Sequence, residues 1–93
     1  MDEPLKAHAA KKVIRQILGT GMITYSQPHA LERLRKHRMS MLDCENVLRG
    51  GSVAEAEWEN GAWRHRVSTN RFEVVVQFLA EDHLLIVTAW RLR

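Results

Sequence analysis

The sequence predicts an α+β fold in which N-terminal helices are followed by a four-stranded antiparallel meander sheet. In the first half of the chain, apolar residues recur at spacings of three and four, the period of a helix. After Gly51 the apolar residues alternate with polar ones, the period of a strand, and Asn60-Gly61 is a strong hairpin turn signal. Helices followed by hairpins are typical of an α+β domain.

The length and composition predict a single domain spanning residues 1–93. Of the 93 residues, 45% are hydrophobic and 27% charged, which is ordinary for a globular protein. No apolar run approaches the roughly 18 residues of a membrane helix, and the acidic start Met1-Asp2-Glu3 lacks the apolar stretch of a signal peptide. Cys44 is the only cysteine, so no internal disulfide forms. We therefore expect a cytoplasmic protein without a membrane partner.

Three helices are expected before Gly51. The first spans residues 4–18 and ends at Gly19-Thr20-Gly21. The stretch Met22–Tyr25 is expected to be an extended connector. The second helix begins near Pro28, which suits a first turn, and runs to about residue 37. Ser40-Met41-Leu42-Asp43 matches a capping box, so a third helix is expected to begin there and to end at Gly50-Gly51.

Four strands are expected after Gly51. A turn at Asn60-Gly61 pairs Trp58 with Trp63, and the same register sets acids against bases, Glu57 with Arg64 and Glu55 with Arg66. A second turn at Thr69-Asn70 places Val67 opposite Phe72 and Arg66 opposite Glu73. The third strand spans residues 71–79 and the fourth residues 84–92, which is apolar on both faces and so is expected to be central or covered on both sides.

The positive charge is concentrated in two clusters. The net charge is +3 and the isoelectric point is about 9.5, which permits nucleic-acid binding without requiring it. Each cluster also has a structural interpretation, a solvated helix face. One cluster contains Lys11, Lys12 and Arg15, and the other contains Arg33, Arg35, Lys36, His37 and Arg38.

His29 and Arg33 are the first candidates for chemistry. Four residues apart at the start of a helix, they share a face, so an imidazole that exchanges protons near neutral pH lies beside a fixed cation. Metal-free RNA cleavage needs a base, an acid and cations at the phosphate. The structural alternatives are a helix-capping histidine and a solvated arginine. The histidines lack metal-ligand spacing, so neither a metal nor a cofactor is expected.

The predicted hairpin carries further candidates. His65 lies on the face of the tryptophans, where it is either a second proton carrier or a buried core residue. Trp63 is suited to stack on a base but also to pair with Trp58 across the strands. Arg64 and Arg66 are either phosphate contacts or cross-strand ion-pair partners.

The motifs and their order resemble those of domain-of-unknown-function family 4258. His29-Ala30-Leu31-Glu32-Arg33 and Arg38-Met39-Ser40 are similar to its "His-Ala-x-x-Arg … Arg-x-Ser" opening, and Val87-Thr88-Ala89-Trp90-Arg91 to its "Val-Thr-x-x-Arg" ending. The segment 63–67 falls where that family has its middle strand. The resemblance covers about residues 24–92, so the helix predicted at residues 4–18 is an addition to this core.

The resemblance implies a small ribonuclease fold of the RelE and barnase type. It also implies metal-independent ribonuclease activity and a cognate antitoxin protein, and by position it selects His29, Arg33, Thr88 and Arg91. The predicted strand places Thr88 and Arg91 on opposite faces unless a bulge intervenes, so at least one of them is expected to be structural.

We therefore expect a bacterial or phage-type, toxin-like endoribonuclease. Its catalytic residues are expected to be His29, Arg33, His65 and Arg91, and its RNA contacts Arg38, Arg64, Arg66, Thr88 and Trp63. The alternatives are a catalytically inactive module of the same fold that binds RNA or a protein, or dimerises through its sheet, and an immunity or antitoxin-like partner.

Overall fold

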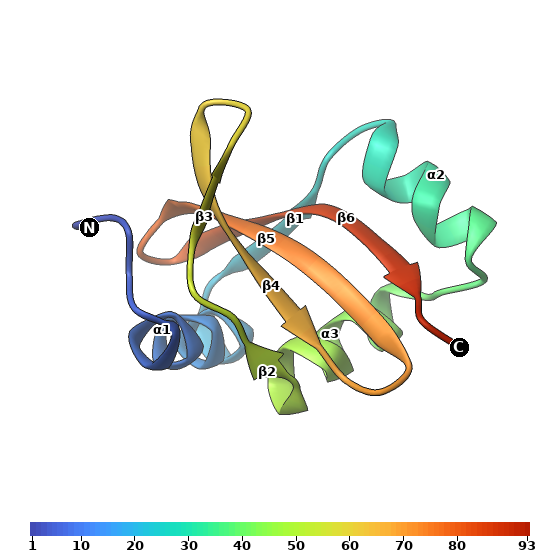
Figure 1. Ribbon diagram of the computed structural model, residues 1–93, viewed down its shortest axis with the longest axis horizontal. Helices are drawn as coiled ribbons and strands as arrows, with labels where there is room; N and C mark the ends of the chain where they lie inside the picture. The colour runs from blue at the N-terminus through green and yellow to red at the C-terminus, as the bar shows by residue number, and fades with distance from the viewer.

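The protein, described by a computed structural model over all residues 1–93, has three helices and a six-stranded mixed sheet (Figure 1). The α+β class is confirmed. The sheet order is β1-β6-β5-β4-β2, and β3 also pairs with β4, so the expected four-stranded antiparallel meander accounts for only part of the sheet. The elements are α1 (Ala7–Thr20), β1 (Met22–Tyr25), α2 (His29–Lys36), α3 (Met41–Gly50), β2 (Ser52–Val53), β3 (Glu57–Glu59), β4 (Ala62–Ser68), β5 (Phe72–Ala80) and β6 (His83–Arg91).

The segment expected to be a connector is a strand. β1 pairs in parallel with β6, with Met22 opposite His83 and Tyr25 opposite Ile86. The local sequence does not predict this pairing, because two parallel strands are joined by a long connection instead of a short turn. With β1 on one side and β5 on the other, β6 is central, as its apolar sequence predicted.

The first hairpin has the predicted register close to its turn. Trp58 lies opposite Trp63 and Glu57 opposite Arg64, and the turn residues Asn60 and Gly61 both have positive φ. The predicted pair of Glu55 with Arg66 is wrong, because Val53 lies opposite Val67, so that residues 54–56 face only residues 65–66. The strand before the turn therefore has one extra residue, which forms a bulge. The bulge allows the Glu55 carboxylate to accept a hydrogen bond from the backbone N–H of Ala7, the first residue of α1.

The second hairpin turns one residue later than predicted. The N–H of Thr69 donates to the carbonyl of Phe72 at 2.9 Å, so Asn70-Arg71 is the tip and Val67 lies opposite Val74. The predicted partner, Phe72, is two residues away. A shift of two preserves the faces, so the apolar residues of β5 still share a face with Val67.

Helices α1 and α3 cover one face of the sheet, which we call the covered face (Figure 1). The capping box predicted for α3 is present, with the Ser40 hydroxyl and the Asp43 carboxylate each accepting from the other residue's backbone N–H. The helix expected as an addition, α1, contributes to the same core, which is formed mainly by Ala10, Ile14, Ile17, Val47, Leu48, Val67, Val74, Val76, Leu84 and Ile86. No helix is long and apolar enough to span a membrane.

The opposite face of the sheet, which we call the open face, is the one that α1 and α3 do not cover. Arg66 lies opposite Val75, and Val75 opposite Thr88, so these residues share the open face. Val75 is nevertheless only 3% exposed. Arg66, its register partner on this face, has its guanidinium 5.7 Å from the ring centroid of Trp90.

Candidate nucleic-acid interface

Helix α2 holds His29 and Arg33 beside β6. The Ser26 hydroxyl donates to the carbonyl of Val87 in β6 at 2.7 Å and accepts from the N–H of Ala30 at 3.2 Å, so it fixes the start of the helix to the sheet. His29 is exposed and Arg33 is half-buried. No carboxylate oxygen lies within 4 Å of a side-chain nitrogen of either residue. The predicted pair is therefore present on one helix face at the surface.

Arg91 supports the end of the same helix. Its Nε donates to the carbonyl of His37 at 3.1 Å, and one terminal nitrogen donates to the carbonyl of Arg38 at 3.1 Å. Its guanidinium also lies 4.9 Å from the ring centroid of Phe72. These bonds satisfy carbonyls that the end of α2 leaves unpaired, so the geometry of Arg91 is that of a structural residue.

His65 lies in the core under the helices. It is only 1% exposed, its Nδ1 is 2.9 Å from the carbonyl oxygen of Ala54, and its ring packs edge-on against Phe78. Its Nε2 is buried without a hydrogen-bond partner. The ring is on the tryptophan face, as expected, but that face is the covered one, so His65 does not meet His29 and Arg33 at a shared surface.

Arg66 is the only cation with ion pairs in the protein. It contacts Glu57 and Glu73 at 3.2 Å and Glu59 at 3.3 Å. Burial alone would lower the pKa of Arg66, but the hydrogen bonds to Glu73 and Glu57 and the nearby charges of Glu59 and Glu57 outweigh it and raise the pKa above its ordinary value. Three carboxylates around one guanidinium compensate its charge, so Arg66 is not available to a phosphate.

The remaining hairpin candidates are split between the two faces. Arg64 shares the open face with Arg66, and its Nε is buried without a partner, as is the Oγ1 of Thr88. Trp63 is on the covered-face side and packs edge-on against Trp58 with ring centroids 5.2 Å apart. The bulge in β6 lies at Val87, before both Thr88 and Arg91, so it does not bring those two residues to the same face.

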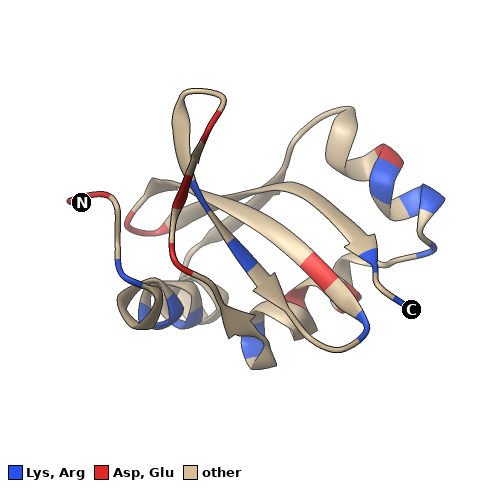
Figure 2. Ribbon diagram, viewed as in Figure 1, with Lys and Arg blue, Asp and Glu red and all other residues tan.

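One end of the molecule carries free positive charge. The end of α2, the β4–β5 turn and the end of β6 gather here (Figure 2). None of the cations there is within 4 Å of a carboxylate, and we call this set the basic end: Arg35, Lys36, Arg38, Arg71 and Arg93. Arg38 has a positive φ of 53°, and the bond from Arg91 to its carbonyl holds the loop that presents it. The sequence predicts the α2 part of this set, whereas Arg71 and Arg93 join it only through the fold.

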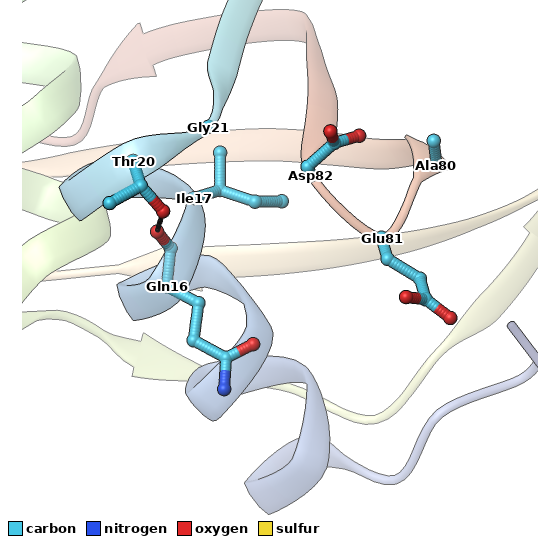
Figure 3. Close-up of a pocket in the computed structure, with 7 residues that line it drawn as sticks. All are labelled: Gln16, Ile17, Thr20, Gly21, Ala80, Glu81 and Asp82. Carbon is cyan, nitrogen blue, oxygen red and sulfur yellow. Dashed lines mark hydrogen bonds between the residues drawn. The ribbon is translucent and has the colours of Figure 1, made fainter.

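The largest cavity is at the other end of the protein. About 520 Å³ in volume, it lies between the end of α1 and the β5–β6 turn and is lined by Gln16, Ile17, Thr20, Gly21, Ala80, Glu81 and Asp82 (Figure 3). The lining holds two carboxylates and no cation, so this cavity does not attract phosphate, and none of the predicted site residues lines it. A smaller cavity of about 340 Å³ is lined by Asp43, Asn46, Val47, Thr69, Asn70, Arg71 and Phe72.

The structure groups no metal-ligating side chains and buries the only cysteine. No three His, Cys, Asp or Glu side chains are grouped closely enough to hold a metal ion. Cys44 is buried in α3. Burial, and then the charges of Asp43 and Glu45, raise the pKa of its thiol to about 12, so it remains protonated at neutral pH.

Comparison with known proteins adds no relative to this picture. No family model matches the chain, and neither a curated protein nor a solved structure matches it. The resemblance to domain-of-unknown-function family 4258 therefore stays a prediction that rests on the motifs.

Proposed function

We propose that the protein is an RNA-binding module of the toxin-like ribonuclease class whose basic end contacts the phosphate backbone. The observation that carries this proposal is that five cations without a carboxylate partner come together from three separate elements at the basic end. Four of the five are arginines, whose planar guanidinium matches a phosphate with two parallel hydrogen bonds.

Binding is favoured over catalysis because the four catalytic candidates are spread over the fold. His65 is buried under the helices and Arg91 is bonded to backbone carbonyls, which leaves His29 and Arg33 alone at the surface. Cleavage through a 2′-hydroxyl needs both a base and an acid near one phosphate. Among the four candidates His29 is the only exposed histidine, and it supplies one of these two groups.

A metal-independent ribonuclease is the second candidate function. The observation that favours it is the placement of His29, which is exposed in the first turn of α2 one turn before the unpaired Arg33. In this account His29 is the base or the acid, Arg33 stabilises the phosphate charge, and a second proton carrier comes from the RNA or from solvent. A cognate antitoxin that covers the basic end would regulate either function.

A salt titration with RNA tests the proposal. We expect the affinity for a fluorescent single-stranded RNA to fall steeply with salt, with log K decreasing by about 0.7 per log unit of salt for each phosphate contacted. Gel analysis of the same RNA, incubated without added metal, separates binding from cleavage. An affinity that is absent at low salt contradicts the proposal, whereas cleavage that depends on His29 replaces it with the second candidate.

A further inference from the structure

Strand β1 leaves its outer backbone groups without partners. The N–H of Met22 donates to the carbonyl of Asp82 at 2.8 Å, and that of Ser26 donates to the carbonyl of Ile86 at 2.9 Å. Backbone groups alternate in direction along a strand, so the N–H and C=O of Ile23 and Tyr25 point away from β6. No strand lies beyond β1 in the sheet, so these four groups form an unpaired edge.

The two edges of the sheet are protected differently. The far edge is split into β2 and β3 by the bulge and carries the carboxylates of Glu57 and Glu59. Charges and bulges of this kind block pairing with another chain. β1 has neither device, since Met22–Tyr25 contains no charged residue, no proline and no bulge, and the side chain of Met22 is 57% exposed.

Charge is distributed unequally along the direction of β1. The β5–β6 turn, with Glu81 and Asp82, lies beside the start of the strand, where the Asp82 carbonyl accepts from Met22. Helix α2 follows its end and carries three cations against one carboxylate, that of Glu32 (Figure 2). Neither the acidic pair nor Arg33 has an ion-pair partner within the chain.

We infer that β1 pairs with β1 of a second copy of this chain. A two-fold axis makes two identical edge strands antiparallel, and the register that pairs all four outward groups of each copy sets Ile23 of each copy opposite Tyr25 of the other. Each such pair exchanges both of its outward hydrogen bonds, and the two sheets become continuous. The same antiparallel arrangement brings the acidic β5–β6 turn of each copy toward the basic α2 of the other, so opposite charges meet twice. This inference does not depend on RNA binding.

Sedimentation over a micromolar to sub-millimolar range, without RNA, tests the charge contact. We expect a concentration-dependent dimer that the double variant Glu81→Lys/Asp82→Lys weakens by about tenfold or more. Arg33→Glu should weaken it as well, and combining the two changes should restore it. The matched control, Asp2→Lys/Glu3→Lys, makes the same change of charge at the exposed N-terminus and should leave the dimer intact.

Amide hydrogen exchange tests which residues of β1 form the dimer interface. The N–H groups of Ile23 and Tyr25 should exchange rapidly in dilute protein and slowly in concentrated protein, whereas that of Met22, already bonded to Asp82, should change little. A monomer at every concentration overturns the inference. So does a dimer in which Ile23 and Tyr25 remain unprotected, or protection that arises only when a different protein supplies the extra strand.

Discussion

The guanidinium of Arg91 donates a hydrogen bond to the carbonyl of Arg38 across 53 residues of sequence. This bond joins the end of the last strand to the loop that follows α2, and a second bond reaches the carbonyl of His37. One side chain therefore fixes the end of α2 and the loop that carries Arg38 relative to the sheet.

Replacement of Arg91 is expected to lower the stability of the fold more than it lowers RNA affinity. Arg91→Lys retains the charge but lacks the planar guanidinium that donates from Nε and a terminal nitrogen to the two carbonyls, so we expect the free energy of unfolding in urea to fall by about 1–2 kcal/mol. Arg93→Lys, at an exposed neighbour without hydrogen bonds, is the matched control and should change stability by less than about 0.5 kcal/mol. An Arg91→Lys variant of unchanged stability and strongly reduced RNA affinity would mean that Arg91 is a phosphate contact instead.

His65 is expected to be structural. His65→Phe removes one hydrogen bond and also the unpartnered Nε2, so we expect a change within about 1.5 kcal/mol in the free energy of unfolding. His65→Ala leaves a cavity beside Phe78 and is expected to cost about 2–4 kcal/mol. RNA affinity and any cleavage should be unchanged in a folded His65→Phe variant. Loss of cleavage with the fold intact would make His65 a proton carrier after all.

The ribonuclease candidate depends on His29. If RNA is cleaved, His29→Ala should abolish cleavage and leave the melting temperature unchanged, because the side chain is exposed and makes no hydrogen bond. His8→Ala, an exposed histidine on α1, is the matched control and should cleave normally. Cleavage that survives His29→Ala would remove this residue from the mechanism.

Cys44 gives the stability a dependence on alkaline pH. The pKa of the Cys44 thiol is near 9 in the unfolded chain and about 12 in the folded protein. The contribution of the buried, protonated thiol to the free energy of unfolding is therefore complete below pH 9 and is lost as the pH rises toward 12. Burial, followed by the charges of Cys44 and Glu45, also raises the pKa of Tyr25, which acts in the same direction. We expect Cys44→Ala to have a shallower fall of stability between pH 9 and 12 than Tyr25→Phe, which retains the thiol. Equal slopes in the two variants and the wild type would contradict this assignment.

Local signals predicted the elements that depend on nearby residues. The Ser40–Asp43 capping box, the Trp58–Trp63 pair and the Asn60-Gly61 turn all form as expected, because each involves residues a few positions apart. The predicted contact of Arg66 with Glu73 also forms, although the register is shifted by two, since a shift of two keeps both side chains on one face.

Contacts between residues far apart in the chain could not be predicted from local sequence patterns. The parallel pairing of β1 with β6 joins residues 61 positions apart, and no turn sequence encodes it. The bulge that directs Glu55 toward α1 brings together two residues 48 positions apart, Glu55 and Ala7. The candidate site shows the same division. His29 and Arg33 share a helix face as the sequence predicts, whereas the burial of His65 and the bonds of Arg91 follow from tertiary packing.

The RNA affinity of two charge-reversal variants tests the central claim most directly. Arg35→Glu/Lys36→Glu changes two exposed cations at the basic end, and Lys12→Glu/Arg15→Glu makes the identical change of charge on two exposed cations of α1. We expect the first variant to lose at least about tenfold in affinity and to reduce the salt slope by about 1.4, the value for two phosphate contacts on a single strand. The second variant should lose no more than a few-fold. Equal losses in both variants, with the same salt slope, would show that RNA is attracted by net charge alone and would contradict a binding surface at the basic end.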